Sequence, residues 1–154
     1  RPGQHQRLVY MPEGSWYDFW SGERYGGGRW HTVEVSPARL ALFQREGTAI
    51  PMAPVQQFTT TAEWPELSWH LTPGDWEGSI SGRVYSDSGE GAVDGKIETF
   101  EGQQGPRKLS LKRSDSRKTS LALSGWGEVA DAELDEHGSW CLSMPDSQIE
   151  LTVE

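Results

Sequence analysis

The sequence predicts an all-β protein made of two small antiparallel β-sandwich units in tandem, with no significant helix. Apolar and polar residues alternate in short runs, as in strands that bury one face. Gly, Pro, Asp and Ser interrupt these runs at close intervals, which is typical of turns. Eighteen glycines further oppose helix formation, because each glycine inside a helix costs about 1 kcal/mol.

The predicted strands follow one another along the whole chain. From the N-terminus, strands are expected at residues 8–11, 15–20, 30–35, 40–44, 68–72, 83–86 and 96–100. The clearest alternation lies in the last third, at Leu109 and Leu111, Leu121 and Leu123, Trp140, Leu142 and Met144, and Ile149, Leu151 and Val153. The connections at 114–116, 136–138 and 145–147 are short and turn-prone, so successive strands are expected to pair antiparallel.

The boundary between the two units is predicted in the segment between Pro54 and Pro65. This segment is polar and rich in threonine, as in a linker. We therefore divide the chain into a partial first unit, 1–58, and a larger second unit, 59–154.

Composition excludes several classes of partner. Lys and Arg total 14 and Asp and Glu total 23, a formal net charge of −9, which disfavours nucleic acid and anionic membranes. No apolar run approaches the roughly 18 residues of a membrane span.

Cys141 is the single cysteine and cannot form an internal disulfide, so the compartment stays open, with the cytoplasm slightly favoured.

The segment 15–20 departs from simple alternation. In a strand, Trp16 and Trp20 would point to one face while Tyr17 and Phe19 point to the other. Both faces are then apolar, which suggests that a further domain covers one of them. We predict that these four aromatic residues dock this unit on a missing neighbour.

Two strings carry a resemblance to a known family. Residues 9–25 read VYMPEGSWYDFWSGERY, and residues 45–52 read REGTAIPM. Together they closely resemble the region that follows the catalytic barrel in glycoside hydrolase family 31, the α-glucosidases and α-xylosidases. Residues 84–91, VYSDSGEG, resemble a degraded form of a string in the family's distal sandwich, with Ser86 and Ser88 in place of acids.

The resemblance implies that the chain is a non-catalytic C-terminal segment, a partial proximal and a distal β-sandwich, which supports the catalytic barrel of the same polypeptide. The family hydrolyses α-glycosides with retention through two carboxylates, and no residue here matches their motifs. The fragment alone is therefore expected to be inactive and to need no cofactor. Two alternatives remain open: a carbohydrate-binding module that recruits α-glucan, and an independent interaction domain.

Other chemical groups have simpler readings. The carboxylates Asp131, Glu133, Asp135 and Glu136 lie in a polar run typical of a solvated turn. Asp87, Glu90 and Asp94 could offer oxygens to Ca²⁺, but their spacing does not fit an EF-hand. The four histidines, His5, His31, His70 and His137, are scattered, so no metal site is predicted.

Cys141 is interpreted as a small buried residue rather than a nucleophile. The basic residues between Arg107 and Lys118 are interpreted as a charged hairpin that protects a sheet edge. Three tryptophans, Trp64, Trp69 and Trp76, fall in or near predicted loops and could stack on the rings of an oligosaccharide, although core packing or domain docking is the favoured alternative.

Overall fold

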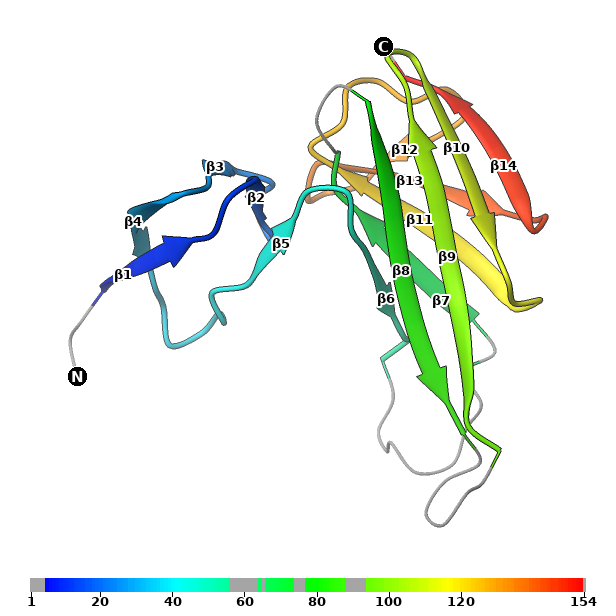
Figure 1. Cartoon of the computed structure of the whole chain (residues 1–154), viewed down its shortest axis with the longest axis horizontal. Helices are drawn as coiled ribbons and strands as arrows, with labels where there is room; N and C mark the ends of the chain where they lie inside the picture. The colour runs from blue at the N-terminus through cyan, green and yellow to red at the C-terminus, as the bar shows by residue number, and fades with distance from the viewer. Residues whose placement is uncertain (1–4, 56–63, 65, 74–76, 88–93, 154) are drawn as a thin grey trace. The chain divides into compact units, whose positions relative to one another are not determined.

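The computed structural model describes residues 5–55, 64, 66–73, 77–87 and 94–153. The described residues form fourteen strands (Figure 1), which confirms the predicted all-β class. No helix in the described part of the chain is long and apolar enough to cross a membrane. Contacts between residues divide the chain into two compact units, 1–46 and 47–154.

The first unit contains five short strands in two sheets. They are β1 (Gln6–Met11), β2 (Ser15–Asp18), β3 (Arg24–Gly26), β4 (Arg29–Glu34) and β5 (Phe43–Arg45). Strands β1 and β4 pair antiparallel as a two-stranded sheet, and β3, β2 and β5 form a three-stranded sheet in that order. Met11, Tyr17 and Val33 are buried here, and the Tyr25 ring makes edge contacts with His31 and Phe43.

Two glycines between β3 and β4 allow a close approach of the turn that follows β1, in the string VYMPEGSW. The Gly27 amide donates to Gly14 O at 2.7 Å and the Gly28 amide to Met11 O at 2.8 Å, so the turn after β1 packs directly on the turn between β3 and β4. A Cβ on Gly27 would collide with the backbone oxygens of Pro12 and Gly14. Only glycine permits this close approach.

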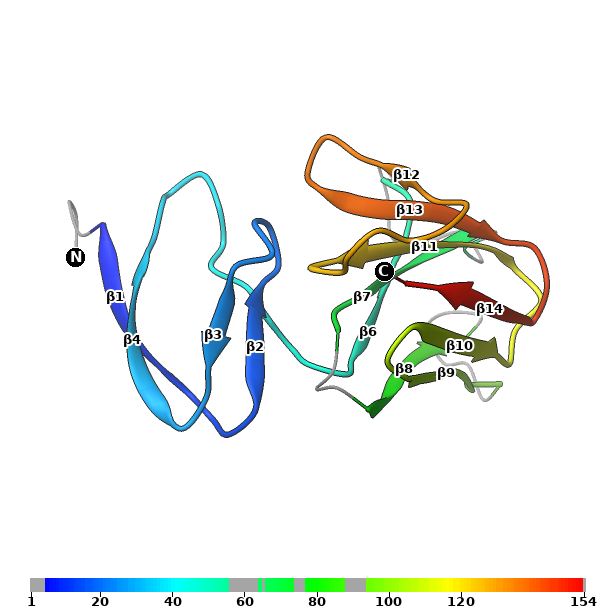
Figure 2. The same cartoon turned by 90° about the horizontal axis from the view of Figure 1, so that it is seen from above.

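The second unit is a β-sandwich. Its strands are β6 (Ala49–Met52), β7 (Glu66–Leu71), β8 (Gly78–Ser86), β9 (Lys96–Gln104), β10 (Lys108–Arg113), β11 (Lys118–Ser124), β12 (Glu133–Leu134), β13 (Ser139–Met144) and β14 (Gln148–Thr152). One sheet has the order β14-β10-β9-β8 and the other β12-β13-β11-β7-β6. Figure 2 shows the two sheets facing each other as layers.

The core of this sandwich lies between the two layers. Trp69 of β7 stacks on Phe100 of β9 with ring centroids 4.8 Å apart, and both side chains are fully buried. Alternating leucines of β10 and β11 complete the core, as the sequence predicted: Leu109, Leu111, Leu121 and Leu123. These residues couple the two sheets because each burial removes apolar area from water.

Strand connectivity differs from the prediction at two of the three short connections. Residues 114–117 join β10 to β11 and residues 145–147 join β13 to β14, and each connection crosses from one sheet to the other. Only the turn at 136–138 closes a hairpin, between β12 and β13. In addition, β7 and β11 pair in parallel. The turn-forming residues therefore predicted correctly where the chain reverses its direction. They did not predict which of the two sheets the next strand joins.

The division between the units falls earlier than the predicted position after residue 58. Strand β6 pairs antiparallel with β7, for example Ile50 with His70, and β7 belongs to the second sandwich. Pro51 occupies β6, which is an edge strand, the usual place for proline in a sheet because it cannot donate to a second neighbour. Residues 47–52 thus belong by their contacts to the second unit.

Candidate functional site

The aromatic segment that follows β2 ends in a tight turn. Asp18 Oδ1 accepts hydrogen bonds from the Trp20 amide at 3.0 Å, the Ser21 amide at 2.8 Å and the Ser21 hydroxyl at 3.0 Å. The Gly22 amide donates to Asp18 O at 2.8 Å, and Gly22 has a positive φ of 70°. The strand predicted at 15–20 therefore stops at Asp18, because a short carboxylate favours a turn.

The four predicted docking residues consequently occupy different environments. Tyr17 is buried and Trp16 is half-buried, with its indole N–H donating to Pro12 O at 2.9 Å. Phe19 and Trp20 lie in the turn, where their rings meet edge to face with centroids 5.2 Å apart. Trp20 donates to Leu40 O at 2.8 Å yet keeps 43% of its surface exposed. Of the four residues, Trp20 offers the largest free surface.

A second aromatic surface of the first unit escaped the sequence analysis. Tyr10 of β1 and Trp30 of β4 are direct cross-strand partners, with ring centroids 5.4 Å apart. Leu8, two residues before Tyr10, lies on the same side of the sheet and faces Thr32. We call this surface, made of Leu8, Tyr10, Trp30 and Thr32, the Tyr10–Trp30 face. The signal that could have revealed it is the unbroken apolar run from Leu8 to Met11, which makes both faces of β1 apolar.

Of the three predicted sugar-stacking residues, the structure describes Trp64 and Trp69, and neither is an exposed ring. Trp69 has 0% of its surface exposed, so a sugar ring cannot reach it. Trp64 is partly buried against the core of the second unit, and Trp76 lies outside the described residues. For Trp69, which lies inside β7, the favoured alternative of core packing therefore holds.

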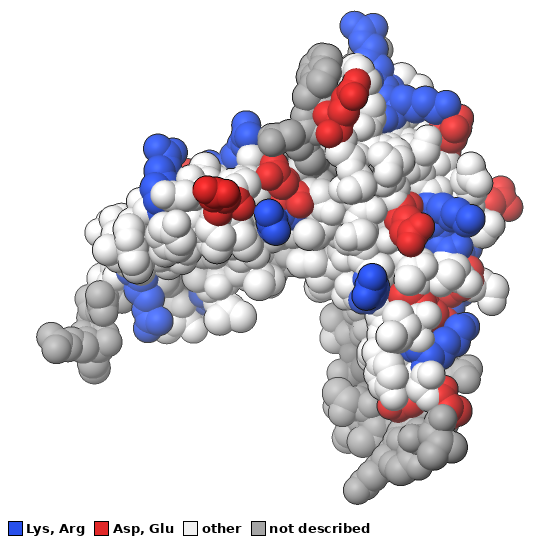
Figure 3. All heavy atoms as spheres, viewed as in Figure 1, with Lys and Arg blue, Asp and Glu red and all other residues white. Residues whose placement is uncertain are grey.

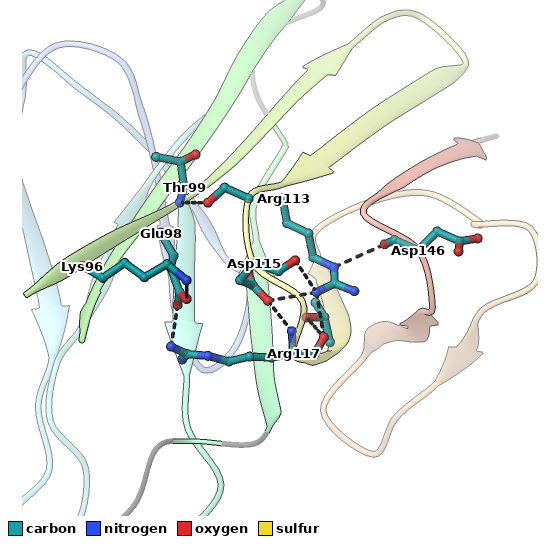
Figure 4. A network of polar contacts seen from close by, with 9 residues as sticks. Lys96, Glu98, Thr99, Arg113, Asp115, Arg117 and Asp146 are labelled. Atoms are coloured by element: carbon teal, nitrogen blue, oxygen red, sulfur yellow. Dashed lines mark hydrogen bonds and ion pairs between the residues drawn. The ribbon is translucent and has the colours of Figure 1, made fainter. Parts of the chain in front are cut away.

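A buried polar network lies at one end of the sandwich (Figure 4). Arg113 pairs with Asp115 at 2.9 Å, and its guanidinium also donates to Arg117 O at 2.7 Å and Asp146 O at 3.2 Å. The Arg113 side chain therefore holds the β10–β11 connection and the β13–β14 connection together. The interpretation of this basic run as an exposed, edge-protecting hairpin was wrong, because Arg113 is buried and β10 lies inside its sheet.

The same network contains a buried carboxylate with two cationic neighbours. Glu98 of β9 lies 2.9 Å from Lys96 Nζ and 2.6 Å from Arg117 Nη2. The Arg117 guanidinium also donates to the Ser86 hydroxyl at 3.2 Å. Pairing of this kind offsets the large cost of burying a charge. These contacts make the network a structural connection between β8, β9 and the start of β11.

Asp135 organises the turn between β12 and β13. Its Oδ1 accepts from the amides of His137 at 2.9 Å and Ser139 at 2.8 Å, and its Oδ2 lies 3.6 Å from Cys141 Sγ. Burial acts to raise the pKa of Asp135, but these hydrogen bonds outweigh it and hold the pKa below its usual value. Asp135 is therefore half-buried and structural rather than part of a solvated run.

The neighbours of Asp135 are poorly suited to catalysis. Burial, together with the charge and hydrogen bond of Asp135, raises the pKa of the Cys141 thiol, so the nucleophilic thiolate is disfavoured. Burial lowers the pKa of His70 to about 4, although the Asp135 charge acts in the opposite direction. A neutral histidine, an ionised aspartate and a protonated thiol do not make an activated nucleophile.

The acidic and histidine side chains are also the candidate metal ligands of the chain. Within the ranges that the structure describes, no three His, Cys, Asp or Glu side chains are grouped as a metal site requires. The possible Ca²⁺ loop after β8 falls largely on residues 88–93, outside those ranges. Charged side chains of both signs are interspersed over the visible face of the second unit (Figure 3), without a large patch of one sign.

One concavity lies on the outer side of the four-stranded sheet of the second unit. It has a volume of about 360 Å³ and is lined by Glu77, Gly78, Gln103, Gln104, Gly105, Lys108 and Ser110. At its rim, Lys108 Nζ pairs with Glu150 at 2.7 Å. The lining combines amide, hydroxyl, carboxylate and ammonium groups without an aromatic ring.

Comparison with known proteins finds one family at the N-terminal end of the chain. Residues 1–50 match the glycosyl hydrolase family 31 C-terminal domain. The chain is 34% identical over 58 residues to α-glucosidase 2 of Bacillus thermoamyloliquefaciens, covering 38% of this chain and 7% of that protein. It is 32% identical over 74 residues to the α-xylosidase of Saccharolobus solfataricus, covering 47% of this chain and 10% of that protein.

Solved structures extend the likeness to the whole chain. A family 31 dextranase of Flavobacterium johnsoniae in complex with isomaltotriose matches 100% of this chain and 25% of its own, with a TM-score of 0.79 and 17% identity. The α-xylosidase of Xanthomonas citri matches 97% of this chain and 17% of its own, with a TM-score of 0.66 and 23% identity. At these identities the match establishes the shared fold. The chain thus spans a tenth or less of the two curated relatives described above.

Proposed function

From the match of residues 1–50 to the glycosyl hydrolase family 31 C-terminal domain, we propose that the chain is the non-catalytic C-terminal part of an α-glycosidase. The observation that carries the proposal is the coincidence of two findings. The matched segment includes the strings at 9–25 and 45–52, and the relatives that share it are much longer proteins named as an α-glucosidase and an α-xylosidase.

The proposed reaction of the complete polypeptide is retaining hydrolysis of α-glucosides or α-xylosides. Such chemistry needs two carboxylates about 5 to 5.5 Å apart, one nucleophilic and one acting as acid and base. The buried carboxylates described here are instead engaged by cations or by backbone amides: Glu98 and Asp115 by arginines, and Asp135 by its turn. The reacting pair is accordingly assigned to a barrel elsewhere in the polypeptide.

The role proposed for this chain is to pack on that barrel and stabilise it. The aromatic turn supplies part of the contact in this proposal, with Trp20 and Phe19 facing the barrel. Trp16 and Tyr17 hold the turn in place from within, since both are largely withdrawn from solvent. Burying an exposed tryptophan at an interface contributes more than most other side chains, because of its large area.

A truncation of the complete polypeptide tests this role. Removal of residues 1–154 is expected to lower the melting temperature of the remaining barrel and to abolish or strongly reduce hydrolysis of aryl α-glucosides and α-xylosides. The substitution Trp20→Ser in the complete polypeptide should also lower the melting temperature, by a smaller amount than the truncation. A barrel that keeps full stability and activity without this chain would contradict the supporting role and favour an independent interaction domain.

A second candidate function is binding of an oligosaccharide by the second unit. The concavity of about 360 Å³ at Gln103, Gln104 and Ser110 falls in the size range of small-molecule sites, and its amide and hydroxyl groups suit sugar hydroxyls. Calorimetric titration with malto- and isomalto-oligosaccharides tests this candidate. A heat of binding that is lost in Gln103→Ala would support oligosaccharide binding, and the absence of any heat of binding at millimolar ligand would exclude it.

A further inference from the structure

The two-stranded sheet of the first unit exposes an unusual amount of apolar surface. Leu8, Tyr10 and Trp30 keep 64%, 48% and 62% of their surfaces exposed, although they are neighbours on one side of β1 and β4. We propose that this Tyr10–Trp30 face is a docking surface, covered in the complete polypeptide by an apolar, largely uncharged surface from outside these 154 residues. The proposal rests on the function proposed above and adds a contact distinct from the aromatic turn.

The first argument is that β1 and β4 carry apolar side chains on both faces, although arginines, Arg29 and Arg7, are the cross-strand partners on the second one. Met11 of β1 and Val33 of β4 lie on the side opposite to Tyr10 and are buried, with 2% and 3% of their surfaces exposed. A sheet that needs covering on one face normally turns a polar second face to water. Two apolar faces therefore indicate a middle layer whose second neighbour is supplied from elsewhere.

The second argument concerns the edges of this sheet. Among the described strands, β1 and β4 pair only with each other, so each presents one unpaired edge. An isolated pair of strands has marginal stability in water, and free edges adjoining an apolar face favour association. A covering segment would both stabilise the pair of strands and prevent its free edges from associating.

The chemistry of the face defines its occupant. Its aromatic and aliphatic groups lie together with Thr32, and the Gln6–Glu34 pair ends the same side of the sheet, while Arg7 and Arg29 belong to the opposite side. Leu8, Tyr10 and Trp30 favour an apolar partner, because a charged partner would lose hydration without gaining an ion pair with these side chains. An anionic glycan or nucleic acid does not fit it.

The same polypeptide is the source that the comparisons favour. The chain spans 7% and 10% of its α-glucosidase and α-xylosidase relatives, so most of such a protein lies outside these residues. A surface in the same polypeptide has a high effective concentration, which lets a modest apolar contact form completely. A second copy of the chain would need a much larger contact to associate at ordinary concentrations.

Hydroxyl-radical footprinting of Trp30 tests the proposal. Trypsin releases residues 30–39 as one peptide in which Trp30 is the sole aromatic residue apart from His31, so its oxidation rate is read directly. The 154-residue chain and the complete polypeptide are compared, with a tryptophan-containing reference peptide added to both samples. Trp30 should react slower by about an order of magnitude in the complete polypeptide, because a covered side chain meets the radical only through local opening.

Substitution provides a second and independent measurement. Trp30→Ser should lower the melting temperature of the complete polypeptide, while the 154-residue chain, in which Trp30 is already exposed, should change little. Thr32→Ser on the same face is the matched control and should be neutral in both. Equal destabilisation of both proteins by Trp30→Ser would overturn the proposal, since the residue would then act within the chain.

The outcomes separate this inference from the function on which it rests. If the complete polypeptide hydrolyses α-glycosides but Trp30 reacts equally in both samples, the docking face is wrong and the proposed function stands. If Trp30 is protected but no α-glycoside is hydrolysed, the function is wrong and the face stands. A 154-residue chain that sediments as a dimer, and becomes monomeric with Trp30→Ser, would assign the face to a second copy and overturn the proposal.

Discussion

The guanidinium of Arg117 lies 2.6 Å from the carboxylate of Glu98 in the second unit, between Nη2 and Oε2. Glu98 belongs to β9 of the four-stranded sheet, and Arg117 directly precedes β11 of the five-stranded sheet. The pair thus connects the two layers of the sandwich at the end where the core of leucines gives way to polar groups. Together with Arg113 and Asp115, it fixes the connection between β10 and β11 (Figure 4).

Glu98→Gln should destabilise the sandwich by about 3 kcal/mol, because the half-buried Arg117 loses the partner of its charge. The free energy of unfolding is measured by urea titration of the whole chain. The matched control is Glu150→Gln, which breaks the 2.7 Å pair with Lys108 between two exposed side chains and should change stability little. Equal effects of the two substitutions would contradict the assignment of Glu98 to a buried network.

The stability of the chain should fall on mild acidification because of His70. Its folded pKa of about 4 lies below the unfolded value near 6.5, so the unfolded state binds the proton first. Stability contributed by neutral His70 is complete above pH 6.5 and is lost as the pH falls towards 4, at up to about 1.4 kcal/mol per pH unit.

Urea unfolding between pH 7 and pH 4 measures this dependence. His70→Gln should flatten the curve in that window, since glutamine does not titrate. His137→Gln, at an exposed histidine of the same unit, is the control and should leave the slope unchanged. A slope that persists in His70→Gln would show that other groups carry the acid sensitivity.

Cys141 should alkylate slowly at neutral pH, since burial and then Asp135 raise the pKa of its thiol. Asp135→Asn removes the charge and should increase the rate of reaction with iodoacetamide a few-fold at pH 8, where the thiolate fraction limits the rate. Glu136→Gln, at the exposed neighbouring carboxylate, is the control. An unchanged pH profile in Asp135→Asn would argue that burial alone sets the pKa of the thiol.

Gly27→Ala should destabilise the first unit by about 1–3 kcal/mol, because the added methyl group has no room against Pro12 O and Gly14 O. Gly28→Asn is the neighbouring control. Gly28 has a positive φ of 72° with open space around it, a conformation that asparagine tolerates. Thermal unfolding followed by the amide signals of β1 and β4 distinguishes the two, and similar melting of both variants would contradict the close approach.

Much of the fold could be predicted in the parts of the sequence where apolar and polar residues alternate regularly. Strands β10, β11, β13 and β14 were predicted from their leucines and other apolar residues, because one face of each strand is buried. Strands β3, β6 and β12 were missed, since they are two to four residues long and too short to establish a period. Strand β6 also contains a proline, which an edge position of a sheet accepts.

The surfaces were harder to predict than the strands. Trp69 and Trp20 are both tryptophans near turns, yet one is fully buried and the other 43% exposed. The difference comes from neighbours distant in sequence: Phe100 covers Trp69, while Asp18 turns the chain so that Trp20 points outward. The network around Arg113 was missed for the same reason, because its partner at Asp146 is brought close only by the sandwich.

The central claim is that this chain supports an α-glycosidase without containing its reacting groups. The most direct test is to assay the purified 154-residue chain on aryl α-glucosides and aryl α-xylosides beside the complete polypeptide. The account predicts hydrolysis by the complete polypeptide and no turnover above background by the chain alone. Turnover by the chain alone would contradict the claim, provided that the activity elutes with the chain in size-exclusion chromatography and disappears when the chain unfolds.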